Sequence, residues 1–310
     1  MKTKVSFPTK KLQMQVLRSL FMEKMSLSES LAKRSKNYVP RKGLKTGVFY
    51  ISRSNLTQLQ KDIAKEPGVL SGVSGNDAIC GLVWRSHARA TLTVRKATSK
   101  KGELDADPDD ESILTMLCDG RPNFSLDLPP TYLGNMAFHI LSRLPLSSLT
   151  SSDQTVATTT TIRKDAKSLN SHDLLDLYTV LKNLCNFDYF EKWKREGMPF
   201  IEGNHLFISS LIMLPMESVC FGDHGIFGNG GLPIALRPLM EGFNKFLQVC
   251  FVLPRNKNGS VEFVANLLEE EMEVLMEDEE FGKYAVCLCR RYLVEYIPIF
   301  GRILFYIPRL

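Results

Sequence analysis

The feature that most constrains the fold of this chain is an alternation of strand-like and helix-like segments. Residues 46–52 are rich in β-branched and aromatic side chains and lie between Gly43 and Ser54, which predicts a strand. Residues 54–65 follow with the composition of a helix, and Ser54 or Asn55 is the expected N-cap. Strand-like and helix-like segments then recur as far as residue 284.

The middle of the chain continues this alternation. Residues 74–90 predict a second helix, which Ser74 or Asn76 would cap. Further expected segments are a loop over 98–110, a strand over 111–118, a turn over 129–135, a helix that starts near Val156, a helix over 171–185 and a strand over 206–213.

The C-terminal third predicts a glycine-rich loop followed by paired strands. The loop covers residues 218–233. Residues 246–253 and 260–267 are expected to be two strands joined by the turn at Asn256–Gly259. Residues 269–284 are expected to form an acidic amphipathic helix.

The first 43 residues are expected to be a basic connector. The first 45 residues hold twelve Lys/Arg and only two acids, in a chain whose formal net charge is +5. Such a basic arm is typical of contact with nucleic acid or an acidic membrane, or of an import signal. Aromatic residues, which stack on single-stranded nucleic acid, are nearly absent from it. We therefore expect a solvated connector and no nucleic-acid partner.

Residues 290–310 form an apolar and aromatic tail. A membrane-spanning helix needs about 20 uninterrupted apolar residues. Glu295, Pro298, Arg302 and Pro308 interrupt this one, so we expect no membrane span. A packed or disordered tail is the expectation, and an anchor in the membrane interface is the alternative.

The cysteines argue for a reducing compartment. There are seven of them, an odd number, and they are scattered without a CxxC pair. We expect reduced thiols in a cytoplasmic protein and no metal site.

His172 and Asp176 form a literal HxxxD pattern. A histidine can take the proton of an alcohol that attacks a thioester, because its pKa lies near neutral pH. However, Asp173 and Asp176 also suit the first turn of a helix, and Leu177 stands where a tight-turning glycine usually follows. We expect a helix start here and assign no catalytic residue.

Two other features are weaker candidates. Residues 225–231 (GIFGNGG) could cradle a phosphate with backbone N–H groups, but neither GxxxxGK[ST] nor a complete GxGxxG is present, so a tight structural loop is expected. The remaining histidines, at positions 87, 139, 205 and 224, assemble no site in sequence. His139 lies in an apolar stretch and is expected to be a hydrogen-bonded core residue.

Five segments in order carry a resemblance to a known family. They are the helix 74–86 with Trp84-Arg85, the run from Asp119-Gly120-Arg121 to Gly134-Asn135, the triplet Ile162-Arg163-Lys164, the stretch 220–233 that opens with Cys220-Phe221-Gly222-Asp223, and the stretch 263–284. Together they resemble BAHD-type, CoA-dependent acyltransferases of the fungal, trichothecene-acetyltransferase-like branch. The resemblance covers roughly residues 44–289.

The resemblance implies an α/β fold, a chloramphenicol-acetyltransferase-like domain with a mixed sheet and flanking helices. Residues 1–43 would correspond to the family's crossover segment and 44–289 to its second domain. The first domain, which carries the family's HxxxDG histidine, has no recognised counterpart. The residues matched to structural motifs are Asp119, Arg121, Asn135, Cys220, Phe221, Gly222, Asp223 and Gly228.

One departure concerns the family's DFGWG motif. Its aspartate is Cys220 here, and its tryptophan is also lost. The family aspartate is expected to be held by an arginine, for which Arg121 is the candidate. Asp223, three residues later, is expected to take over the role by pairing with Arg121 or Arg237.

The function implied by the resemblance is transfer of an acyl group from an acyl-CoA, with acetyl-CoA as the expected donor. The acceptor would be a hydroxyl or amine of a small secondary metabolite, and no metal is expected. Two alternatives are a non-catalytic remnant or binding protein, and a half-enzyme completed by a separate chain that carries the first domain.

Overall fold

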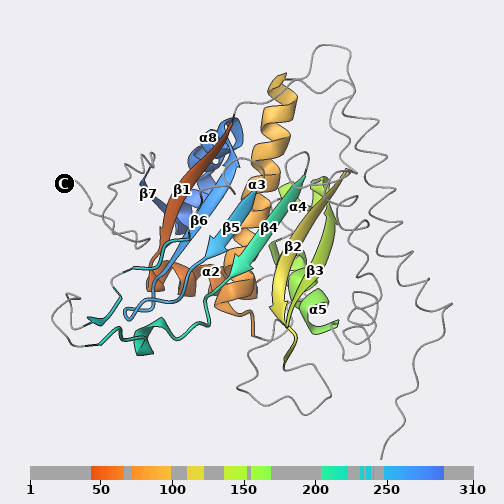
Figure 1. Ribbon diagram of the computed structural model, residues 1–310. Coiled ribbons are helices and arrows are strands. Elements are labelled where there is room, and N and C mark those ends of the chain that lie inside the picture. Colours follow the sequence, from red (N-terminus) through yellow and green to blue (C-terminus); the bar gives the residue numbers. More distant parts are fainter. Residues whose placement is uncertain are drawn as a thin grey trace, which may run out of the picture.

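The structure is a computed structural model of the full 310-residue chain, shown in Figure 1. It describes residues 43–65, 72–98, 110–121, 136–151, 155–168, 204–222, 231–233, 235–238, 240 and 248–289.

A single mixed sheet forms the centre of the described structure (Figure 1). Its seven strands are β1 (Leu44–Ile51), β2 (Glu111–Asp119), β3 (Ala137–Pro145), β4 (His205–Ser210), β5 (Val249–Val252), β6 (Val261–Leu268) and β7 (Val286–Cys289). Their order is β3-β2-β4-β5-β6-β1-β7. Strands β2, β4 and β5 are parallel, and the other pairs are antiparallel.

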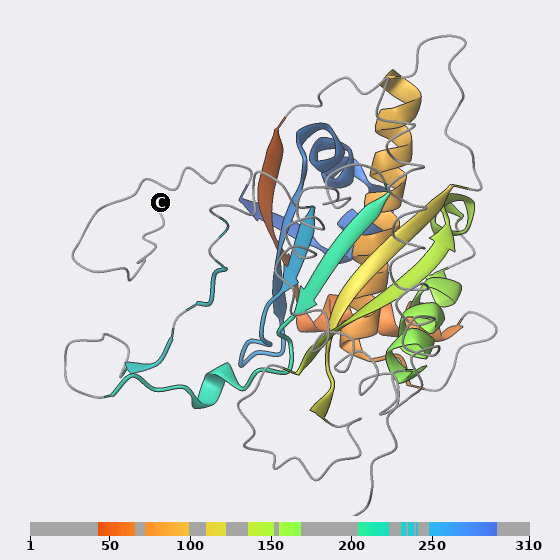
Figure 2. The ribbon, with the colours of Figure 1, turned by 45° about the vertical axis from the view of Figure 1, so that its right-hand side comes forward.

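The helices gather on one face of this sheet (Figure 2). They are α2 (Arg53–Lys65), α3 (Gly75–Thr98), α4 (Leu146–Thr150), α5 (Thr155–Ser168), α8 (Glu269–Glu277) and α9 (Glu279–Tyr284). The long helix α3 lies at the centre, and Trp84 on it is fully buried in the main core. The expected α/β fold, with a mixed sheet and flanking helices, is therefore confirmed.

The opposite face carries none of the α-helices among the described residues, and we call it the helix-free face. It holds a second and smaller core. Val48, Leu253 and Val264 pack there, with Leu236 and Met240 against them. The chain around Leu236 and Met240 therefore folds back over β1, β5 and β6. A cavity, described below, lies beside this segment.

The N-caps of helices α2 and α3 can be compared with the predicted ones. At α3, Asp77 N–H donates to Ser74 Oγ at 3.1 Å and Ser74 N–H donates to the Asp77 carboxylate at 3.2 Å, which is a capping box. The Ser74 cap is confirmed. At α2, Asn55 N–H donates to Ser52 Oγ at 3.1 Å, so Ser52 caps this helix and the expected Ser54 or Asn55 cap is wrong.

Three elements were not expected from the sequence, namely β3, α4 and β7. The long acidic helix expected over 269–284 is two helices, because Asp278 interrupts it and accepts the Phe281 N–H at 2.8 Å as the N-cap of α9. His139 was expected in the core, but β3 places it on the helix-free face with its side chain exposed.

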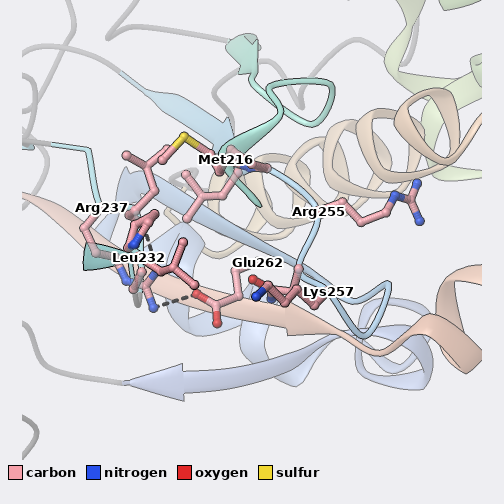
Figure 3. Close-up of a pocket in the computed structure, with 12 residues that line it drawn as sticks. Met216, Leu232, Arg237, Arg255, Lys257 and Glu262 are labelled. Atoms are coloured by element: carbon pink, nitrogen blue, oxygen red, sulfur yellow. Dashed lines mark hydrogen bonds and ion pairs between the residues drawn. The ribbon is translucent and has the colours of Figure 1, made fainter. Parts of the chain in front are cut away.

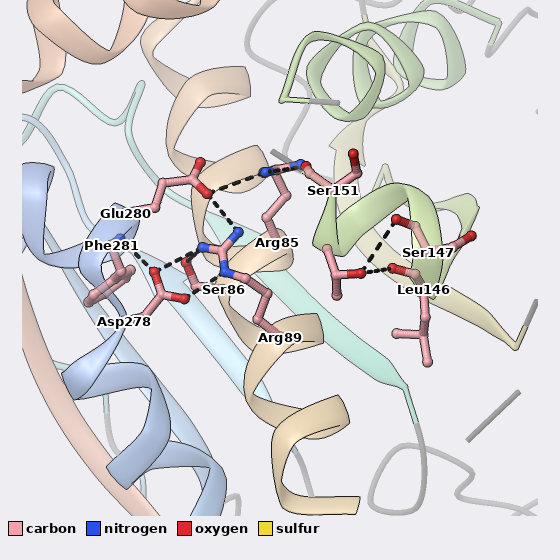
Figure 4. Close-up of polar contacts among 10 residues, drawn as sticks. Arg85, Ser86, Arg89, Leu146, Ser147, Ser151, Asp278, Glu280 and Phe281 are labelled. Atoms are coloured by element: carbon pink, nitrogen blue, oxygen red, sulfur yellow. Dashed lines mark hydrogen bonds and ion pairs between the residues drawn. The ribbon is translucent and has the colours of Figure 1, made fainter. Parts of the chain in front are cut away.

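An ion-pair cluster ties α3 to α9 (Figure 4). Arg89 contacts both carboxylate oxygens of Asp278, at 2.6 and 2.9 Å, and Glu280 at 2.6 Å. Arg85 is fully buried and donates from Nη2 to the Ser151 carbonyl at 2.8 Å and to Glu280 at 3.3 Å. The cluster fixes α9, and with it the start of β7, against the central helix.

Among the described residues, no helix combines the length and the apolar character that crossing a bilayer requires.

Candidate functional site

Most of the residues singled out in the sequence gather at one end of the sheet. The strands β1, β2, β4 and β5 all run in the same direction and end at Ile51, Asp119, Ser210 and Val252. We call this end the carboxyl edge. In open α/β sheets, ligands bind in the crevices beyond the carboxyl ends of parallel strands. The carboxyl edge is therefore the expected place for a ligand site.

Asp119 and Arg121 lie at the end of β2 and pair with each other. Arg121 Nη1 contacts Asp119 Oδ1 at 2.9 Å, and the Arg121 N–H donates to the same oxygen at 3.0 Å. Both side chains are partly exposed, at 54% for Asp119 and 33% for Arg121. Arg121 thus contacts the carboxylate of its own turn. Its expected pairing with Asp223 involves a residue outside the described ones and stays a prediction.

Cys220, Phe221 and Gly222 follow β4 at the same edge. Cys220 and Phe221 are exposed. Phe221 N–H donates to the Gly231 carbonyl at 2.9 Å, so the chain closes a loop between these residues. Gly222 and Gly231 have φ values of 94° and 74°, a conformation that glycine adopts without strain. Of the tight structural loop expected over 225–231, only Gly231 lies among the described residues, so that loop stays a prediction.

Several candidates fall outside the described residues. These are Asn135, His172, Asp176, Asp223, His224 and Gly228. The proposed exchange of roles between Cys220 and Asp223 therefore stays a prediction, and so does the non-catalytic nature of His172.

A cavity of about 300 Å³ lies on the helix-free side of the carboxyl edge (Figure 3). We call it the Arg237 cavity. Its size is at the lower end of the range for small-molecule sites. Its apolar wall comes from the chain after β4, from the segment after Gly231 and from the end of β5, through Met216, Leu232, Pro233, Leu236, Leu253 and Pro254.

The charged residues of the Arg237 cavity are three cations and one acid. Arg237 Nη2 contacts Glu262 Oε2 at 2.6 Å, and Arg237 Nη1 donates to the Leu236 carbonyl at 2.8 Å. Lys257 and Arg255 come from the turn between β5 and β6. Figure 3 shows that the Arg255 side chain points away from the other labelled residues. Its Nη2 atom lies 3.1 Å from the position that a Cβ atom on Gly75 would take.

A shallow depression beside this cavity has a different chemistry. It is lined by the first turns of α2, through Arg53, Ser54, Thr57, Gln58 and Lys61. All five side chains are polar, and two are cations without an acid among them. The turn before β6 separates the depression from the cavity, because a Cβ atom on Gly259 would lie 2.8 Å from Arg53 Cδ.

The described histidines lie in three different settings. His87 is fully buried behind the sheet, with Nε2 at 3.0 Å from Gln248 Oε1 and 3.6 Å from Glu271 Oε2. Burial, helped by nearby Arg143, lowers the pKa of His205 to about 4, so this side chain is neutral at pH 7. His139 stands 5.8 Å from the Phe207 ring, measured between ring centroids.

The sequence analysis did not identify the residues that line the Arg237 cavity and the α2 depression as candidate site residues. Arg53 and Lys61 belong to an expected helix, and Arg255 and Lys257 belong to an expected turn. The cations on these two elements could have indicated an anion-binding site. Arg237 and Glu262 come together only in the folded chain, and no local sequence pattern predicts their contact. Among the described residues, no group of three or more His, Cys, Asp or Glu is placed to hold a metal ion.

The model of a family described as the Transferase family matches residues 3–282. An isocyanide synthase–NRPS hybrid of Aspergillus fumigatus is 32% identical over 78% of the chain. An O-acyltransferase of Monascus ruber is 26% identical over 76% of the chain. The chain spans 15% of the first of these relatives and 47% of the second.

Among solved structures, the chain resembles F. graminearum TRI101 complexed with coenzyme A and deoxynivalenol. The TM-score is 0.62 at 19% identity, over 81% of this chain and 50% of that one. At this identity the likeness concerns the fold.

Proposed function

Because the chain belongs to the Transferase family, whose model matches residues 3–282, we propose that it forms one domain of an acyl-CoA-dependent O- or N-acyltransferase. This membership confirms the BAHD-type resemblance of the sequence. The acceptor in this proposal is a hydroxyl or amine of a small secondary metabolite. The observation that carries the proposal is the family match, combined with two cation-bearing hollows at the carboxyl edge.

The α2 depression suits the phosphates of the acyl donor. CoA carries several negative charges at one end, and such groups are stabilised by cations and by the N-terminus of a helix. Arg53 lies in the first turn of α2, and Lys61 stands two turns further along the same exposed face. Among the described residues, no acid lines the depression, so its described wall holds no negative charge that would repel a phosphate.

The acyl transfer itself needs a base. Attack of a hydroxyl on a thioester forms a carbon–oxygen bond, releases the CoA thiol and requires removal of the hydroxyl proton. His87 and His205 are unsuited to this task, because His87 is fully buried with Gln248 and Glu271 and because the pKa of His205, lowered to about 4, makes it a weak base. We propose that the base is not among the described residues. In the half-enzyme alternative, a separate chain supplies it.

The cytoplasm is the proposed location. The described cysteines at positions 80, 118, 220, 250 and 287 are all free thiols. Free thiols persist in a reducing compartment.

Calorimetric titration with CoA tests the donor site. We expect the full-length protein to bind CoA, and the double variant Arg53→Gln/Lys61→Gln to bind it roughly five- to twentyfold more weakly, since each exposed charge contributes a modest amount. Lys65→Gln is the matched control, because Lys65 lies on the same helix but pairs with Asp62 at 2.9 Å. Failure of the unmodified protein to bind CoA would contradict the proposed function.

An acyl-transfer assay separates catalysis from binding alone. Purified protein is given acetyl-CoA and a panel of small hydroxylated and amino acceptors, and release of the free thiol is followed. Acetyl-CoA is the first donor to test. CoA binding without turnover would favour the non-catalytic or half-enzyme reading, and turnover would place the base within this chain.

A further inference from the structure

We propose that the Arg237 cavity binds a small apolar molecule that carries a single carboxylate. The inference deepens the proposed function, on which it rests only in naming this molecule as the acceptor. The binding of such a molecule can be measured without any acyl transfer.

The wall of the cavity calls for an apolar body. Seven of its lining residues are aliphatic, Met or Pro side chains, namely the six named above and Ala235, and they come from three segments that are distant in sequence. Small-molecule sites combine mostly apolar walls with a few placed polar groups that fix the orientation of the ligand. The Arg237 cavity sets these apolar side chains beside Arg237, Lys257 and Glu262, whereas the side chains that line the α2 depression are all polar.

The ion pair in the wall limits how much negative charge the cavity accepts. Glu262 contacts Arg237 at 2.6 Å, and their side chains are only 21% and 31% exposed. The positive charge of Arg237 is therefore matched within the protein. Glu262 also repels a multiply charged group such as a phosphate.

Lys257 supplies the unmatched positive charge. It lies on the exposed turn before β6 and lines the cavity, and within the described part of the chain no acid lies within ion-pair distance of it. Arg255 adds little to the interior, because its side chain is directed toward Gly75 (Figure 3). One unmatched cation over an apolar wall complements one carboxylate on an apolar body.

The α2 depression and the Arg237 cavity therefore favour different anionic ligands. The α2 depression has two cations and no acid, which favours phosphates, and the Arg237 cavity has one unmatched cation and a carboxylate neighbour, which favours a monoanion. The turn that carries Lys257 also contacts Arg53 through Gly259, so ligands in both hollows would lie on either side of the same turn.

Calorimetric titration of the full-length protein with octanoate, octanamide and octyl phosphate tests this assignment. We expect saturable binding of octanoate, at least fivefold weaker binding of the neutral octanamide, and weaker binding of octyl phosphate. Lys257→Gln should weaken octanoate about five- to tenfold, the size of one lost charge contact. Lys61→Gln, in the other hollow, is the matched control and should leave octanoate binding unchanged.

Replacing the acid tests the selectivity. Glu262→Gln removes the repulsion and frees Arg237, so it should raise the affinity for octyl phosphate relative to octanoate by about fivefold or more. Circular dichroism of each variant establishes that it is folded before titration. An equal change for both ligands would overturn the role given to Glu262.

The outcomes remain separable from those of the proposed function. If octanoate fails to saturate, or binds Lys257→Gln as tightly as the unmodified protein, the inference is wrong even where CoA binds. If octanoate behaves as described and CoA does not bind, the carboxylate site stands and the acyltransferase proposal fails.

Discussion

At the scale of single residues, the loop after β4 depends on two glycines that cannot exchange for larger residues. Gly231 has φ 74°, and a Cβ atom there would lie 2.4 Å from the Gly222 carbonyl oxygen. Gly222 and Gly231 lie at opposite ends of the loop. The contact between them and the hydrogen bond from the Phe221 N–H to the Gly231 carbonyl hold the two ends together. Leu232, the next residue, lines the Arg237 cavity.

Gly231→Ala is therefore expected to open the loop. The strained φ and the backbone clash should lower the free energy of unfolding by about 1–3 kcal/mol and speed hydrogen exchange at the Phe221 amide. Gly282→Ala is the control, because that glycine lies in α9 with nothing within 4 Å of a Cβ atom, and alanine favours helix. Equal effects of both substitutions, by urea denaturation, would contradict the clash.

His205 makes stability depend on pH. Its folded pKa of about 4 lies below the ordinary value of 6.5, so between these values the unfolded chain takes up a proton that the folded chain does not. Above pH 6.5 His205 is neutral in both states and does not lower the stability. As the pH falls from 6.5 through 4, up to about 3 kcal/mol of the free energy of unfolding is lost.

Urea denaturation at pH 7 and pH 4.5 checks this expectation. His205→Gln should lose less stability between the two pH values than the unmodified protein does. An identical loss in both would show that other groups carry the acid sensitivity.

At the scale of elements, the sequence predicts those whose local pattern is strong and misses those that depend on distant partners. The strand 44–51, the helices after Ser52 and Ser74, and the two strands around the turn at 256–259 all follow from local composition and turn residues. β7 is only four residues long and lies beside β1, more than 230 positions earlier in the sequence, so its local signal is weak. In β3, His139 interrupts the apolar pattern because it faces outward.

The candidate site divides in the same way. The residues matched by family motif, Asp119, Arg121 and Cys220 to Gly222, lie at the carboxyl edge, where the ends of β2 and β4 place them. The ion pair of Arg237 with Glu262 joins a segment outside any strand to β6. Charge alone could not reveal it, since each residue is one among many charged residues in the chain.

The contact between α3 and α9 predicts a strong effect at Asp278. This residue caps α9 and binds Arg89 at 2.6 and 2.9 Å, with side-chain exposures of 10% and 20%. Asp278→Ala leaves the Arg89 charge without its main partner and removes the cap, so we expect a loss of about 2–4 kcal/mol in the free energy of unfolding.

Arg89→Met/Asp278→Ala should recover part of that loss, because no unpaired charge remains. Lys65→Ala breaks an exposed pair with Asp62 and is expected to change stability by less than 1 kcal/mol. Chemical denaturation of the three variants compares them directly. A double variant less stable than Asp278→Ala would show that Arg89 stabilises the fold by itself.

At the scale of the whole molecule, three of the five exposed large apolar side chains of the described residues lie on the segment that leaves β4, and the other two lie on β7. Met213 is 89% exposed, Leu214 48% and Phe221 59%. Figures 1 and 2 both show this segment leaving the sheet at its lower end. Exposed apolar groups of this kind mark an interface or a tendency to aggregate.

The chain on its own is therefore expected to self-associate. Size-exclusion chromatography at several concentrations should show species larger than a monomer, and Met213→Ser/Phe221→Ser should shift them toward the monomer. Leu288→Ser, on the edge strand β7 and 52% exposed, is the control and should leave the larger species unchanged. A monomer at all concentrations would refute this expectation.

The place of β1 in the sheet has a consequence for how the protein is made. Thr46 on β1 bonds Asn266 on β6, 220 positions later in the chain. At the usual 5–20 residues per second, a ribosome adds that many residues in about 10 to 45 seconds. During this time the nascent β1, with Val48, Phe49 and Ile51, has neither of its neighbouring strands. A chaperone that shields this strand until β6 leaves the exit tunnel would therefore be expected to raise the yield of folded protein.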